Sequence, residues 1–221
     1  MQTFATPAPI TAVVTVPAGS IQITAADRAE TTVQIRPADP AKSRDVKLAE
    51  GTTAAYSDGT LRVTAPAGHR FLGSSGAVAV TVQLPAGSRV EAKTASAQFT
   101  TAGPLGEVVF DSAQATVNVE QAAKARLNVV DGGITVGRLA GDAEIRTVRG
   151  DIQVTEAAGG TVVLRTETGS ITVTGAAGVS AALDAGTTVG RVSNALMNAG
   201  STPGLNIRAT TTVGDITASS L

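Results

Sequence analysis

Short runs in which aliphatic and polar residues alternate fill most of the chain, and glycine-containing turns separate them. The pattern is clearest over residues 127–173, where three successive copies read LNVVDGGITV, IRTVRGDIQV and LRTETGSITV. In each copy an aliphatic residue precedes an isoleucine by seven positions, and a glycine precedes the same isoleucine by two. Alternation with a period of two predicts half-buried β-strands, and the glycines predict the turns between them.

The turns recur at a regular interval along the second half of the chain. The residue two positions after each turn glycine, or its equivalent, gives anchors that lie 16 to 24 residues apart: Phe99, Ala115, Ile134, Ile152, Ile171, Val192 and Ile216. Because no repeat has room for a crossover helix, a period of about twenty residues predicts an all-β fold, a parallel β-solenoid in which each repeat is one coil. The aliphatic-to-anchor interval grows to nine from Leu183 and Ile207, which predicts wider coils near the C-terminus.

A column of five glycines marks one corner of the predicted solenoid: Gly132, Gly150, Gly169, Gly190 and Gly214. We expect positive φ angles there, which glycine adopts without steric cost. The anchors, together with Val136, Val154 and Val173, are predicted to point inward. Aromatic residues make up only 2% of the chain, so small β-branched side chains must fill a narrow interior.

The whole chain, residues 1–221, is predicted to be a single solenoid domain, with irregular coils over 1–93 and regular coils over 94–221. Residues 39–50, DPAKSRDVKLAE, interrupt the strand pattern. Pro40 suits a first helical position, Asp39 can cap it and Gly51 can end it, so one short helix or helical turn is predicted there. The composition of residues 66–76, PAGHRFLGSSG, predicts a loop.

Composition argues against several partners and cofactors. The formal charge is −1 and tryptophan is absent, so there is neither a basic field for phosphates nor a stacking platform for bases, and we expect no nucleic acid partner. Without cysteine there are no disulfides or thiolate metal sites, and we expect no cofactor or metal. The N-terminal residues lack a signal-peptide pattern, and no window approaches the roughly 18 apolar residues of a membrane span. We therefore expect a cytoplasmic location.

Three stretches of the chain resemble a family of bacterial β-strand-repeat proteins, the DUF4097 proteins that are labelled candidate adhesins, and especially its short actinobacterial members. They are MQTFATPAPITAVVTVPAGSIQITAADRAETTVQIRPADP, TVQLPAGSRVEAKTASA and the turns RGDIQV, TGSITV and VGDITASSL. The resemblance covers nearly the whole chain and implies a right-handed parallel β-helix. It implies no catalytic residues, because the family has no established activity. Adhesins are normally exported, and this chain shows no export signal.

Few residues carry chemistry in a pattern that points to a reaction. His69 is the only histidine and is interpreted as an exposed loop residue, with a role as a functional base as the alternative. Asp151 and Asp215 share a column, but the sequence order puts three coils, about 14 Å, between them, more than the ~5 to 10 Å over which paired carboxylates cleave glycosides. Arg149-Gly150-Asp151 spells an integrin-binding tripeptide, although the predicted corner already explains the glycine and the aspartate.

The C-terminal part of the chain contains a candidate interaction end, formed by Leu196, Met197 and Ile216. Leu196 and Met197 place an apolar pair in NALMN, either as packing of a wide corner or as an interaction patch. The chain finishes on the coil motif TTVGDITASSL without an obvious cap, so the last coil around Ile216 is expected to be an open edge.

Three functions remain open from the sequence. The first is a non-catalytic structural or interaction module, a scaffold that binds a protein or a cell-envelope surface. The second is a self-assembling structural protein, a homo-oligomer that stacks through its solenoid ends. The third is a carbohydrate-binding or carbohydrate-active β-helix, which the lack of an acidic cluster and of aromatic platforms disfavours.

Overall fold

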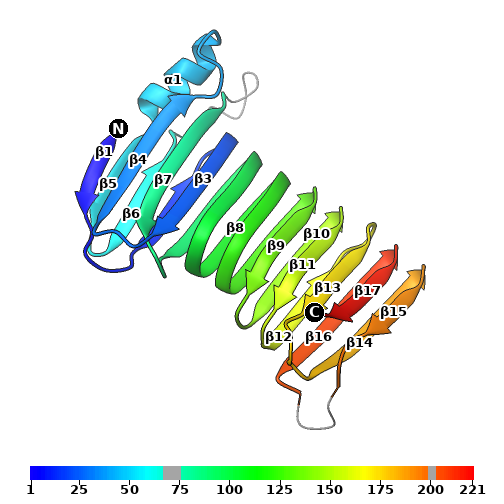
Figure 1. Cartoon of the computed structure of the whole chain (residues 1–221). Helices are drawn as coiled ribbons and strands as arrows, with labels where there is room; N and C mark the ends of the chain where they lie inside the picture. Colours follow the sequence, from blue (N-terminus) through cyan, green and yellow to red (C-terminus); the bar gives the residue numbers. More distant parts are fainter. Residues whose placement is uncertain (67–75, 199–202) are drawn as a thin grey trace.

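The described residues form one rod of stacked β-coils. A computed structural model describes residues 1–66, 76–198 and 203–221. The N-terminal strands and the single described helix occupy one end of the rod, and β14 (Ala181–Val189) and β15 (Val192–Ala195) occupy the other (Figure 1). Apart from its two end residues, the predicted loop at 66–76, including His69, lies outside the described residues.

The remaining elements follow the chain in order. They are β1 (Gln2–Ala5), β2 (Thr11–Thr15), β3 (Ala18–Ala26), β4 (Glu30–Pro37), α1 (Ser43–Gly51), β5 (Thr53–Ser57), β6 (Thr60–Thr64), β7 (Val78–Pro85), β8 (Arg89–Asp131), β9 (Ile134–Leu139), β10 (Ala143–Arg149), β11 (Ile152–Ala157), β12 (Gly160–Arg165), β13 (Ile171–Gly175), β16 (Leu205–Val213) and β17 (Ile216–Ser220). The strand content, the short helix and the long sheet of parallel strands confirm the all-β prediction. β8 continues through several corners, which makes it far longer than the other strands.

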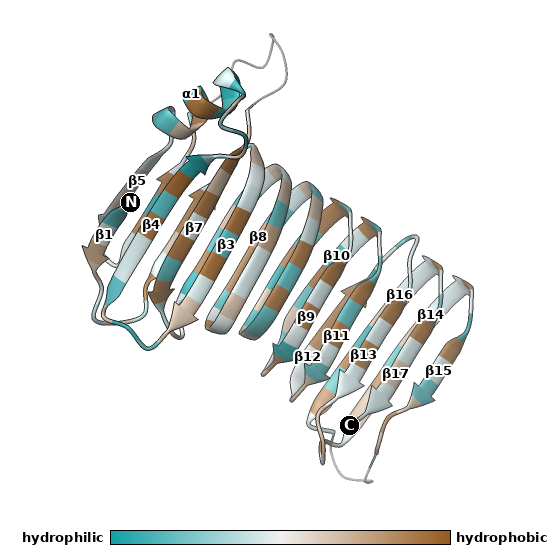
Figure 2. Ribbon diagram, turned by 45° about the horizontal axis from the view of Figure 1, so that its top comes forward, coloured by the Kyte–Doolittle hydropathy of each residue, from teal (hydrophilic) through white to brown (hydrophobic). Residues whose placement is uncertain are grey.

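Stacked coils place like residues in columns along the rod. Ile134 pairs with Ile152, and Ile152 pairs with Ile171, all in parallel register and all buried. Along β11 these buried residues alternate with exposed polar ones, and hydrophobic and hydrophilic bands alternate along many strands of the rod (Figure 2). Stacking in columns buries the apolar side chains of each coil, which a single coil could not bury on its own. In the adjoining coil the partner of Ile134 is Val117, not the predicted anchor Ala115.

The aliphatic column on the opposite face corrects the predicted growth of the aliphatic-to-anchor interval. Leu164 pairs with Ala209, and Ala209 pairs with Ala185. These alanines, not Ile207 and Leu183, hold the positions equivalent to Leu164. Seven residues still separate each alanine from its anchor, so the interval is constant, and the larger aliphatic two positions earlier caused the error.

The order of coils in space differs from their order in sequence at both ends. Near the C-terminus, β16 pairs with both β12 and β14, while β17 pairs with both β13 and β15. The last two strands of the chain therefore lie inside the rod, and β14 and β15 form its end. Near the N-terminus, β2 lies between β6 and β8, and β3 lies between β7 and β8.

The N-terminal end departs from the parallel pattern. β4 pairs antiparallel with both β1 and β7, and β5 pairs antiparallel with β6. The helix α1 begins at Ser43, later than predicted, because Asp39 lies in a turn that precedes it. In that turn the Asp39 carboxylate accepts the backbone N–H of Ala41 (3.0 Å) and lies 3.2 Å from the side-chain nitrogen of Lys42. That hydrogen bond, followed by the one to Lys42, lowers the pKa of Asp39 below its ordinary value.

A buried carboxylate fastens α1 to the strands beside it. Asp45 lies in the first turn of the helix, and its two oxygens accept the backbone N–H groups of Ala77 (2.9 Å) and Asp39 (3.2 Å). These groups lie just before β7 and just after β4, so one side chain joins three elements.

Candidate functional site

The glycine column forms a corner at which successive coils approach closely. The five glycines have φ between 135° and 151°. A Cβ atom on Gly150 would lie 2.2 Å from the carbonyl oxygen of Gly132, and one on Gly169 would lie 2.0 Å from that of Gly150. Both the backbone conformation and the close approach require glycine at these positions.

A ladder of threonines runs along the same corner. The hydroxyl of Thr147 donates to the Gly132 carbonyl (3.1 Å), and that of Thr166 donates to the Gly150 carbonyl (3.0 Å). In the next two coils in space, Thr211 donates to Gly169 and Thr187 donates to Gly214, each at 3.0 Å. Each threonine therefore joins its own coil to a neighbouring glycine.

Sequence reasoning missed this ladder, although the sequence carries a signal for it. Each of these threonines stands three residues before a column glycine, in TVRG, TETG, TTVG and again TTVG. The repeated Thr-x-x-Gly spacing could have identified the corner.

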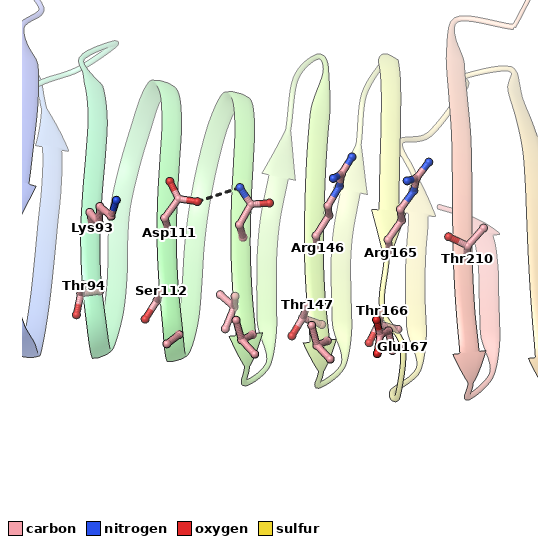
Figure 3. A pocket seen from close by; sticks show the side chains of 15 residues that line it. Lys93, Thr94, Asp111, Ser112, Arg146, Thr147, Arg165, Thr166, Glu167 and Thr210 are labelled. Carbon is pink, nitrogen blue, oxygen red and sulfur yellow. Dashed lines mark hydrogen bonds between the residues drawn. The ribbon is translucent and has the colours of Figure 1, made fainter.

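A groove of about 600 Å³ runs beside the threonine ladder, across six coils of the rod (Figure 3). At the spacing of neighbouring strands, six coils span about 24 Å. The register of the coils sorts the lining residues into three columns, which we call two walls and a floor. The first wall is the column Lys93, Asp111, Asn128, Arg146, Arg165 and Thr210, and the floor is the column Thr94, Ser112, Val129, Thr147 and Thr166. The opposite wall carries Ala113, Val130, Val148 and Glu167.

The two walls of this corner groove differ in chemistry. Val130 and Val148 are 49% and 36% exposed, so the second wall presents apolar surface to solvent. On the first wall Asp111 accepts a hydrogen bond from the Asn128 amide (3.0 Å), and Arg146 forms an ion pair with Glu144. Arg146 and Arg165 lie side by side and point in the same direction (Figure 3).

The three residues of the predicted interaction end do not come together. Ile216 is fully buried between Ile171 and Val192, because β17 lies between β13 and β15. The expectation that Ile216 marks an open edge is therefore wrong. Leu196 is half-buried and packs against the core, whereas Met197 is exposed, with its backbone N–H donating to the Ser220 hydroxyl (2.9 Å).

The end of the rod is instead formed by the coil of β14 and β15. Val189 and Val192 are exposed there, although Ile216, which pairs with Val192, and Ile171, which pairs with Ile216, are fully buried. β14 and β15 each pair with a strand on one side only in the described part of the chain.

Asp151 and Asp215 lie nearer to each other than the sequence order implied. The inserted coil leaves two strand spacings between them, about 10 Å, not three. Each carboxylate is engaged with the adjoining coil: Asp151 accepts the backbone N–H of Ser170 (2.7 Å), and Asp215 accepts that of Arg191 (2.8 Å). The two aspartates therefore connect coils at the corner.

Arg149, the first residue of the integrin-like tripeptide, lies 3.6 Å from the Asp131 carboxylate in the neighbouring coil. Among residues 1–66, 76–198 and 203–221, no group of three histidine, cysteine or acidic residues is arranged to hold a metal ion. Within the same ranges, no helix has the length and apolar character that a membrane crossing needs.

Comparison with known proteins agrees with the repeat architecture. The model of the family described as Toastrack DUF4097 matches residues 13–220. The chain belongs to the Toastrack DUF4097 family. No curated protein matches this Toastrack chain.

The solved structures similar to the Toastrack chain include three candidate adhesion proteins. A candidate cell adhesion protein from Clostridium sporogenes is 13% identical with a TM-score of 0.38, and the match covers 100% of this chain and 98% of the other. Candidate adhesins from Bacteroides fragilis and Parabacteroides distasonis are 13% and 11% identical, with TM-scores of 0.48 and 0.45. Each of these two matches covers 98% of this chain and 95% of the other.

Proposed function

We propose that this Toastrack chain is a non-catalytic interaction module whose corner groove binds an extended segment of a partner protein. The observation that carries the proposal is the continuous groove across six coils with exposed valines along one wall. Exposed apolar surface in a long depression is typical of a binding site. The coils beneath are fixed by the threonine ladder, so a ligand would meet a preorganised surface.

The composition of the groove favours a polypeptide over a sugar. The residues lining it include no aromatic side chain that could stack on a sugar ring. The engagement of Asp151 and Asp215 with backbone amides supports a structural role for both carboxylates.

Site-specific photo-crosslinking tests this proposal. A photoreactive phenylalanine analogue is placed at Val148 in the groove and, as the control, at Gln153, an exposed position on β11 outside it. In cells that express the full chain, we expect adducts with a defined protein from position 148 and none from position 153. Equal adducts from both positions, or none from position 148, would contradict the proposal.

Self-assembly is a second candidate, which the coil of β14 and β15 favours. Its strands pair on one side only among the described residues, and the valines near its corner are exposed. Light scattering should then show a mass that rises with concentration and that Val192→Lys lowers. A constant monomer mass would contradict assembly through this end.

We also propose that the solenoid is right-handed and that each coil contains about twenty residues, which is the period of the repeat in the sequence. The cytoplasmic location expected from the sequence also stays a prediction.

A further inference from the structure

We propose that the segment bound in the corner groove is acidic, with a carboxylate held between Arg146 and Arg165 and an apolar side chain on Val130 and Val148. This inference rests on the proposed function and adds the chemistry of the partner. It follows from two features: a pair of adjacent arginines on one wall and a pair of exposed valines on the other.

The two arginines are direct neighbours in the parallel ladder. Arg146 on β10 pairs with Arg165 on β12, so their backbones are about 4.8 Å apart. Both side chains extend in the same direction along the groove wall (Figure 3). Like charges at directly paired positions repel each other, so an anion that contacts both would relieve that repulsion.

The negative charge available to this pair within the described chain is small. Glu144 contacts Arg146, and its carboxylate also lies 3.8 Å from Arg126, so one acid serves two cations. The residues that pair with the arginines on either side are Asn128 and Thr210, both uncharged. Arg165 has no ion pair or side-chain hydrogen bond among the described residues. Glu167 lines the opposite wall of the groove, and Thr166 lies between it and Arg165.

The guanidinium groups are well suited to a carboxylate. An arginine can donate two parallel hydrogen bonds to one carboxylate, which makes such pairs geometrically specific as well as strong. Two arginines on neighbouring strands offer donors to both oxygens of one acidic side chain.

The opposite wall determines what accompanies the acid. Side chains of an extended segment point alternately to its two sides. A segment that runs along the rod with a carboxylate toward Arg146 and Arg165 therefore turns the adjacent side chains toward Val130 and Val148. Apolar side chains would cover these exposed valines, so the partner sequence should alternate acidic and apolar residues across the groove.

Fluorescence anisotropy with the full chain tests this inference. The probes are three labelled heptapeptides that alternate valine with glutamate, glutamine or lysine. We expect the Glu/Val peptide to bind tightest and to weaken at high salt. Arg146→Glu and Arg165→Glu should each weaken it about tenfold to a hundredfold, and the double variant should favour the Lys/Val peptide.

Arg62→Glu is the matched control, because Arg62 is exposed on β6 outside the groove, and it should leave binding unchanged. Thermal unfolding of each variant confirms that the fold is intact. If the Gln/Val peptide binds as tightly as Glu/Val, and Val148→Asp abolishes both, the groove function stands and the acidic preference is overturned. If no peptide binds and position 148 yields no crosslink, both proposals fail. Tighter binding of a labelled oligothymidine than of Glu/Val would also overturn the inference.

Discussion

Each corner of the rod beside the groove is held by a glycine and a threonine that act on neighbouring coils. The glycine carbonyl lies against the next coil, where a nearly buried threonine hydroxyl donates to it. A buried carbonyl without a partner costs free energy, so the hydroxyl stabilises the close approach that the glycine permits. Two of these threonines, Thr147 and Thr166, also line the corner groove, which links the stability of the corner to the shape of the site.

Replacing Thr166 by valine removes this hydroxyl while keeping the shape of the side chain. We expect Thr166→Val to lower the free energy of unfolding by about 1 to 2 kcal/mol, because the Gly150 carbonyl loses its hydroxyl donor. Denaturant unfolding measures the change. Thr161→Val is the control, because Thr161 is exposed on β12 and its hydroxyl makes no hydrogen bond among the described residues, so its effect should stay within about 0.5 kcal/mol. Equal losses in the two variants would contradict the role of the ladder.

The strands at the two ends of the rod pair in different ways. At the N-terminal end, antiparallel strands replace parallel coils, and α1 packs beside β4 and β7. At the C-terminal end the final strands insert between earlier ones. The pairing of β4 with β7 and that of β17 with β13 both join segments far apart in the sequence.

Asp45 makes the N-terminal arrangement testable. Asp45→Ala should lower the free energy of unfolding by about 2 to 3 kcal/mol, since two backbone N–H groups lose their acceptor. Hydrogen exchange should accelerate in α1 and at the start of β7. Glu50→Ala, an exposed change in the same helix, should alter neither quantity. Unchanged exchange in the Asp45 variant would show that another contact holds the helix.

The sequence predicted the strands, the glycine corner and the existence of the helix, because alternation and turn glycines are local signals. It could not predict the coil order, since anchors such as Val192 and Ile216 have the same local pattern whichever neighbour they pair with. The groove was missed for a related reason. Arg146 and Arg165 stand 19 residues apart, and only their register in the ladder brings them together.

At the scale of the whole molecule, the inserted coil β16–β17 affects both the end of the rod and the groove. It buries Ile216, leaves β14 and β15 as the terminal coil, and places Thr210 beside Arg165 at one end of the groove. Stacking in sequence order would instead place β14 beside β12, and the groove would end in a different set of side chains. Both the end of the rod and the lining of the groove therefore depend on this order of coils.

Engineered disulfides test that order directly, because the chain contains no cysteine of its own. Thr172 on β13 pairs with Thr217 on β17, and Thr217 pairs with Ser193 on β15. Neighbouring strands bring Cα atoms to about 5 Å, within reach of a disulfide, whereas two spacings exceed it. We predict that Thr172→Cys combined with Thr217→Cys oxidises to a disulfide, measured by mass spectrometry of the free thiols, and that Thr172→Cys combined with Ser193→Cys stays reduced. The opposite result would show that the coils stack in sequence order and that β17 does not lie between β13 and β15.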